Sequence, residues 1–172
     1  METYDNFDLP LYLAEEEGGV YSYREPNCDI ILLEFGGCYI KQIEPDYPNM
    51  VCTQLSFSKE DLSLRERGQY LKHGGISIGV WETFDELGRL SSSEDMDQQY
   101  PLSWPEVEKI LKDNKISLLT AYSISRYIDQ ETNKPIWSIS IKINDTTILR
   151  YTIDAQTGDI ISKKIEELNF IL

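Results

Sequence analysis

The stretch that most constrains the fold is residues 74–111, GGISIGVWETFDELGRLSSSEDMDQQYPLSWPEVEKIL. It contains a strand–turn–strand pattern followed directly by the start of a helix. Gly74-Gly75 separates two β-rich runs, and glycine accepts the positive φ that a tight hairpin turn needs. Gly88 occupies the left-handed position of the next reversal. Because similar runs (CDIILLEF, CYIKQI, MVCTQLSF) precede it, region 28–97 is predicted to be a meander of short antiparallel strands.

The helix after this meander has defined ends. Ser103 and Glu106 form the spacing of a capping box, in which each side chain satisfies an amide of the first turn. Pro105 falls in that turn, where its missing N–H costs nothing, and Asn114 is a reasonable stop. One face of the helix is predicted to be apolar, formed by Trp104, Val107, Ile110 and Leu111.

The tail is predicted to contain four more antiparallel strands. In IWSISIKIN, isoleucines alternate with Ser138, Ser140 and Lys142, so one face should be buried and the other wet. Residues 154–158 turn the chain into the last strand. The fold class is therefore α+β: an antiparallel β meander, one capped helix, and a four-stranded antiparallel sheet. The expected divisions are an acidic irregular arm (1–27, with one helical turn near 11–17), a β meander (28–100), and a helix plus sheet (101–172), as modules or as one continuous domain.

The charge of the chain is unusual and uneven. The 172 residues have a net charge of −14, of which residues 1–60 contribute −9, residues 61–100 contribute −4 and residues 101–172 contribute −1. Such a field repels nucleic acid and anionic lipid and speeds encounter with a basic partner. The alternative is that the charge serves solubility alone.

Sequence signals favour a cytoplasmic protein, or a periplasmic one if a leader has been removed. No basic start with a long apolar run, and no run of about 20 apolar residues, is present. The three cysteines, Cys28, Cys38 and Cys52, lack CxxC spacing and are expected to be buried, reduced thiols.

No catalytic, cofactor or metal motif is found, so the sequence indicates a protein that is not an enzyme and has no cofactor. His73 is the single histidine and is predicted to be an exposed turn residue; pairing it with Cys52 as nucleophile and base has nothing to fix the geometry. A calcium loop starting at Asp95 fails, because Tyr100 stands where glycine is needed and Glu106 serves the helix cap. A third hypothesis is a hydrolase that uses a pair of carboxylates, although nothing in the sequence singles out one pair.

Two segments resemble known families. Residues 79–90, GVWETFDELGRL, resemble the MORN-like repeats of bacterial antitoxin-type proteins, and EDMDQQYPLSWPEVEKIL is similar to the junction that often follows such repeats. The tail, with WSISI followed by YTIDAQTGDII, resembles a PepSY-type meander. Residues 66–162 are covered, whereas residues 1–60 match no family pattern.

The resemblance implies a non-catalytic immunity protein that binds and neutralises a cognate toxin, delivered between bacteria by a type VI or related secretion system. A basic nuclease is one such toxin, since its nucleic-acid groove attracts carboxylates. The alternative is a PepSY-like envelope or regulatory module that binds a protease or peptide. No nucleic-acid or membrane partner is expected.

Partner contacts are predicted in the acidic N-terminal half. Carboxylates would supply the charge and tyrosines the anchors, because tyrosine is enriched at interface hot spots; the alternative for each tyrosine is core packing. The candidate residues are Asp5, Asp8, Tyr12, Glu15, Glu16, Glu17, Tyr21, Tyr23, Glu44, Asp46 and Tyr47, together with Tyr4.

Overall fold

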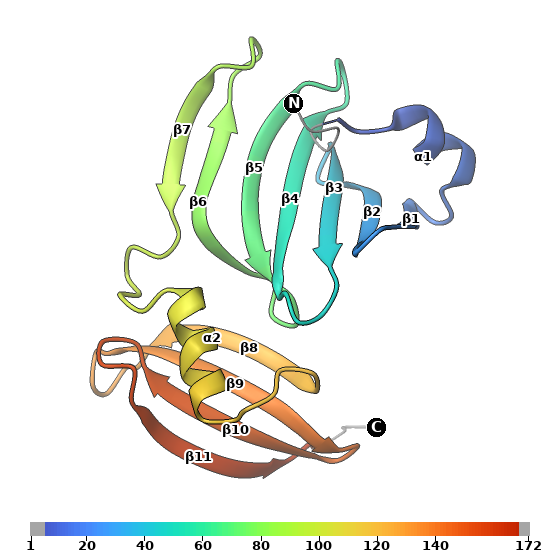
Figure 1. The fold of residues 1–172 in the computed structure, drawn as a ribbon. Helices are drawn as coiled ribbons and strands as arrows, with labels where there is room; N and C mark the ends of the chain where they lie inside the picture. Colours follow the sequence, from blue (N-terminus) through green and yellow to red (C-terminus); the bar gives the residue numbers. More distant parts are fainter. Residues whose placement is uncertain (1–5, 169–172) are drawn as a thin grey trace. The chain divides into compact units, whose positions relative to one another are not determined.

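The computed structural model describes residues 6–168, which form two compact units (Figure 1). Unit 1 comprises Met1–Tyr70 and Ser77–Met96, and unit 2 comprises Leu71–Ile76 and Asp97–Leu172. The α+β class predicted from the sequence is confirmed, with strands predominating over helices.

Unit 1 is built on a seven-stranded meander with one short helix. The sheet follows chain order from β1 to β7, so each strand pairs with the next along the chain. The elements are α1 (Leu9–Glu15), β1 (Val20–Glu25), β2 (Cys28–Phe35), β3 (Cys38–Pro45), β4 (Val51–Ser58), β5 (Leu64–Leu71), β6 (Ile76–Phe84) and β7 (Leu90–Asp95).

Of the arm predicted over residues 1–27, the helical turn expected near 11–17 is present as α1, whereas the expectation that the rest is irregular is wrong at Val20–Glu25, which is a strand. Asp8 caps α1 by accepting a hydrogen bond from the Leu11 amide (3.0 Å), and Pro10 stands in the first turn. Val20–Glu25 then pairs with β2 along its whole length. The sequence did not predict this strand because VYSYRE mixes aromatic and charged residues. Its pairing with the apolar β2 shows which of its side chains face the core.

One face of the unit 1 sheet is covered by the N-terminal segment. Phe7 stacks on Tyr39 with ring centroids 4.8 Å apart, and Tyr12 meets Phe7 edge-on at 5.4 Å. Beneath these rings lie buried side chains of two strands, Cys28, Ile30 and Leu32 of β2 and Leu55 and Phe57 of β4. Aromatic packing over this apolar layer therefore fixes α1 on the sheet.

Unit 2 is a helix packed on a four-stranded antiparallel sheet, as predicted. The sheet has the order β11-β10-β9-β8, and the elements are α2 (Trp104–Asp113), β8 (Ala121–Ile128), β9 (Pro135–Asn144), β10 (Thr147–Asp154) and β11 (Ile160–Glu167). The capping box is present: the Ser103 amide donates to Glu106 Oε2 at 2.8 Å. Trp104, buried on α2, lies 5.7 Å from Trp137 of β9 between ring centroids.

A buried arginine sits against the same aromatic layer. The Arg126 side chain is only 6% exposed and forms an ion pair with Asp97 at 2.5 Å. Its guanidinium lies over the rings of Tyr100, at 4.4 Å, and Trp137, at 5.3 Å. The acidic turn before α2 is thus held to β8 through Asp97.

The prediction that one face of β9 is exposed to solvent is wrong at its two serines. Ser138 and Ser140 are 6% and 1% exposed. The reason is that β9 is an inner strand, flanked by β8 and β10. Longer side chains of these neighbouring strands cover a residue as small as serine. For instance, Arg150 Nε donates to Ser140 Oγ at 3.4 Å. Lys142 is exposed, as predicted.

Two turn predictions have different outcomes. Gly88 has the predicted positive φ of 71°. Between β5 and β6, however, the positive φ values belong to His73 (64°) and Gly75 (62°), so the turn is not a two-residue Gly-Gly hairpin. His73 is exposed, as predicted. Of the three free cysteines, Cys28 and Cys52 are buried, whereas Cys38 is half-buried.

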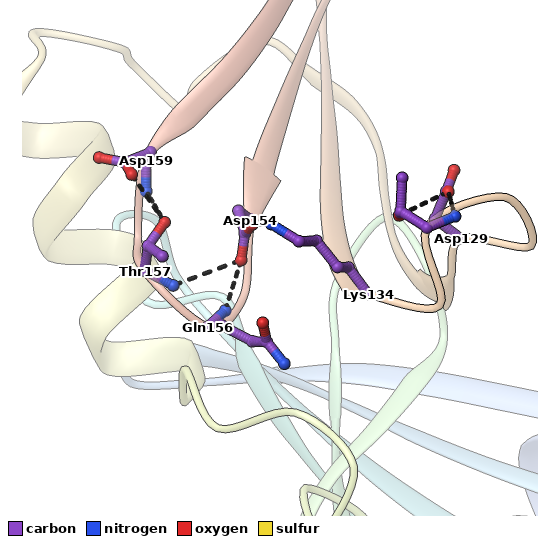
Figure 2. Close-up of polar contacts among 7 residues, drawn as sticks. Asp129, Lys134, Asp154, Gln156, Thr157 and Asp159 are labelled. Carbon is purple, nitrogen blue, oxygen red and sulfur yellow. Dashed lines mark hydrogen bonds and ion pairs between the residues drawn. The ribbon is translucent and has the colours of Figure 1, made fainter.

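The turn from β10 to β11 is organised by one buried carboxylate (Figure 2). Asp154 accepts hydrogen bonds from the amides of Gln156 (2.8 Å) and Thr157 (3.3 Å) and an ion pair from Lys134 Nζ (2.8 Å). The Lys134 ammonium and these amides lower the pKa of Asp154 below its ordinary value. The Asp154 carboxylate therefore connects the turn to the residue before β9 through these hydrogen bonds and the ion pair.

Candidate functional site

The charge of the chain divides between the two units. Unit 1 has 19 acidic and 6 basic residues and unit 2 has 11 and 10, so unit 1 has a formal charge of −13 and unit 2 of −1. The gradient seen along the sequence is therefore a contrast between two bodies. A basic partner would be attracted to unit 1, because charges of one sign steer association with the opposite sign.

The candidate residues that can be placed lie at separate positions on unit 1, and Tyr4 and Asp5 lie outside the described residues. Glu15, Glu16 and Glu17 are exposed at the end of α1. Glu16 is partly engaged, because its Oε2 accepts a hydrogen bond from the Gly19 amide at 2.6 Å. Asp8 is the helix cap described above. Of these predicted contact residues, Glu15 and Glu17 are exposed carboxylates, whereas Asp8 and Glu16 also accept hydrogen bonds from the backbone of the same segment.

The tyrosines separate in the same way. Tyr12 is 3% exposed and its hydroxyl donates to the Gly19 carbonyl at 3.0 Å, so it is a core residue and not a surface anchor. Tyr21 and Tyr23 stack on each other at 5.7 Å and are half-buried on the covered face of the sheet. Tyr47 is 50% exposed and is the one predicted tyrosine with a freely accessible ring among the described residues.

Glu44 and Asp46 are each tied to a neighbour. The Tyr70 hydroxyl donates to Glu44 Oε1 at 3.2 Å, and burial, together with the negative charge nearby, raises the pKa of Tyr70 well above its ordinary value. Arg24 bridges Asp46 and Asp29. A shallow pocket of about 310 Å³ includes Tyr23, Arg24, Asp29 and Glu44 in its lining. Its charges are largely compensated, which weakens its attraction for a basic group.

The structure brings together another set of acidic residues that the sequence did not single out. A groove of about 320 Å³ runs over β5, β6 and β7, and we call it the Trp81 groove; it is lined by Glu66, Trp81, Glu82, Thr83, Ser92, Ser93, Glu94 and Met96. Arg67 neutralises Glu82 through an ion pair of 2.6 Å. Among the described residues, no basic side chain pairs with Glu66 or Glu94.

The floor of the Trp81 groove is preorganised. The Trp81 indole lies flat against Gly68 of β5, where a Cβ would be only 2.1 Å from Trp81 Cδ2. Its Nε1 donates to the Gln69 carbonyl at 3.0 Å. Glycine at this position therefore creates the space that the indole fills, which is a known way of stabilising a strand that contains glycine.

The arrangement is suited to binding a cation. Trp81 and Glu94 are direct partners across β6 and β7, so an aromatic face and a carboxylate lie side by side. Tryptophan is the side chain best suited to cation–π contact, and an adjacent carboxylate adds charge pairing. The sequence contained one signal for this site, a glycine at position 68 within a β-rich run. Only the pairing of β5 with β6 shows that this glycine lies under Trp81.

No group of three or more His, Cys, Asp or Glu side chains with metal-binding geometry occurs in residues 6–168. Within the same residues, no helix is long and apolar enough to cross a membrane. The chain matches no protein-family model, no curated protein and no solved structure.

Proposed function

We propose that this chain is a non-catalytic interaction protein that binds and neutralises a basic toxin, in the manner of a bacterial immunity protein. The observation that carries the proposal is the formal charge of −13 on unit 1, together with a preformed groove in which Trp81 lies beside the unpaired carboxylates of Glu66 and Glu94. The resemblance of residues 79–90 to MORN-like repeats of antitoxin-type proteins supports the same class, and those residues include Trp81 itself.

The mechanism follows from the chemistry of the surface. Long-range attraction would speed the encounter with a basic toxin, and desolvated contacts at the groove would slow its release. Inhibition would result when unit 1 covers the basic surface with which the toxin binds its substrate. A toxin that acts on nucleic acid is the natural target, because its substrate is also an anion.

The test is binding to, and protection from, the product of the neighbouring gene. The wild-type chain should bind that product with an association rate that falls steeply as salt rises. The double variant Glu66→Lys/Glu94→Lys should slow association by roughly tenfold or more and abolish protection. The matched control is Glu131→Lys/Glu167→Lys, which makes the same charge change at two exposed residues of unit 2. Absence of binding and of protection with the wild-type chain would refute the proposal.

The alternative is a PepSY-like regulatory module that binds a protease or peptide through unit 2. It is favoured by the resemblance of the tail, in which the buried Asp154 brackets the turn into the last strand. The same two double variants separate the alternatives. If unit 2 is the binding unit, the Glu66→Lys/Glu94→Lys variant of unit 1 binds the partner as the wild-type chain does.

A further inference from the structure

The outer edge of β7 offers a site for another strand. β7 is the last strand of the seven-stranded sheet, and the sheet order gives it one neighbour, β6, among the described strands. All six of its residues are exposed. An exposed strand edge presents backbone N–H and C=O groups that can pair with another chain.

The pairing register identifies the outward-facing groups. The Met96 amide donates to the Gly79 carbonyl at 2.9 Å, and Val80 and Asp95 are the next pair in register. Hydrogen-bonded and non-bonded pairs alternate in an antiparallel ladder, so Trp81 with Glu94 is again a bonded pair, and Glu82 with Ser93 is not. The N–H and C=O of Ser93 therefore point away from β6, toward the open edge.

The Trp81 groove adjoins this edge. An added strand would lie about 4.8 Å from β7 and its alternate side chains would stand beside Ser92 and Glu94. Glu94 is thus a direct cross-strand neighbour for a basic side chain of the added strand. Trp81 is one strand further in, roughly 10 Å from the added backbone, which is within the reach of an extended arginine.

We propose that the edge of β7 binds an extended basic segment of the partner, which adds to the sheet as an eighth, antiparallel or parallel strand and places an arginine or lysine over Trp81. This inference rests on the proposed function and names where and how the basic partner is held. Main-chain hydrogen bonds supply the affinity in such strand addition, and side-chain pockets supply the specificity.

Charge decides between this occupant and a second copy of the chain. Two copies joined at β7 would bring together the Glu94 carboxylates of both copies and two units of −13 each. Like charges across a strand pair are destabilising. Glu94 and the net charge of unit 1 therefore oppose self-pairing of the sheet at this edge, whereas a basic segment neutralises Glu94.

The probe is the blocked peptide (Arg-Thr)4, with (Glu-Thr)4 as its charge-reversed counterpart. On adding (Arg-Thr)4 to the full chain, the Ser93 amide should become protected from hydrogen exchange and Trp81 fluorescence should change. (Glu-Thr)4 should do neither. No binding of (Arg-Thr)4 at 1 mM and low salt, binding without protection of Ser93, or dimerisation of the chain through β7 would overturn the inference.

A matched pair of proline variants tests the edge itself. Ser93→Pro removes the outward N–H and should weaken the binding of (Arg-Thr)4 by about fivefold to tenfold, as expected for one lost hydrogen bond. Proline is tolerated at edge positions whose N–H faces solvent. The control is Ser22→Pro on β1, the opposite edge, where the Glu34 amide donates to the Gly19 carbonyl and the same alternation turns Ser22 outward. Ser22→Pro should leave the affinity unchanged.

Equal effects of the two prolines would refute the site at β7. If Ser93→Pro does not fold, the exchange measurement on the wild-type chain decides the question. The inference and the proposed function fail separately. Capture of the neighbouring gene's product by a folded Ser93→Pro variant at wild-type affinity refutes strand addition only, whereas failure of the wild-type chain to capture it refutes the function.

Discussion

Gly68→Ala is expected to dismantle the floor of the Trp81 groove without adding charge. An alanine Cβ at this position would lie 2.1, 2.2 and 2.6 Å from three atoms of the Trp81 indole. Ordinary contact begins near 3.4 Å, so the ring has to retreat by at least about 1.3 Å. That movement breaks the hydrogen bond from Trp81 Nε1 to the Gln69 carbonyl.

The free energy can be estimated from these two effects. Overpacking of a well-filled site costs about 1–3 kcal/mol, and loss of a hydrogen bond about 1 kcal/mol. Gly68→Ala should therefore lower the free energy of unfolding by about 2–4 kcal/mol. The assay is urea-induced unfolding followed by far-UV circular dichroism. Ser92→Ala, which also lies in the groove but adds no atoms, is the control and should cost under about 0.5 kcal/mol.

Fluorescence and a mutant cycle identify the cause. Trp104 and Trp137 are 1% and 0% exposed, so increased acrylamide quenching in Gly68→Ala would report Trp81. In a Trp81→Ala background the clash is absent, and the same glycine substitution should cost at least about 2 kcal/mol less. If Gly68→Ala costs as much without the indole as with it, the steric explanation is refuted.

Two further predictions concern unit 2. The pKa of Asp154 is lowered in the folded state. Its contribution to stability is therefore present above the pKa of an unfolded Asp, near 4, and is lost as pH falls through the lower pKa of the folded state. Asp154→Asn should flatten the acid side of a plot of unfolding free energy against pH, and an unchanged slope would contradict this. Replacing Arg126 by alanine removes its ion pair with Asp97 and empties the space over Tyr100 and Trp137, so a loss of about 3 kcal/mol is expected in thermal or urea unfolding. The control is Arg89→Ala at an exposed ion pair, which should cost under about 1 kcal/mol.

Local patterns in the sequence predicted the features that depend on neighbours in the chain. Ser103, Pro105 and Glu106 specify the start of α2 because a capping box closes within one helical turn. Gly88 specifies a left-handed turn position for the same reason. The meander was also predictable, because each of its strands pairs with the next one along the chain.

The site depends on groups that the chain brings together only by folding. Gly68 and Trp81 are 13 positions apart, and nothing in either residue alone indicates that the indole fills the space above the glycine. Glu66 and Glu94 come from strands on either side of β6. Tyr12 was predicted as a contact because tyrosine suits both cores and interfaces, and only its packing against Phe7 and Tyr39 decides between them.

The opening stretch, residues 74–111, illustrates the division between sequence and tertiary structure. By itself the sequence determined that it contains a hairpin and a capped helix, since turn chemistry and capping act over a few residues. Tertiary structure decided that Trp81 and Glu94 line a groove with Glu66 and that β7 is left as an open edge. It also decided that almost all of the net charge belongs to one of the two units. The physical reason is that strand pairing and side-chain packing join residues distant in sequence, and local propensities do not encode which of them will meet.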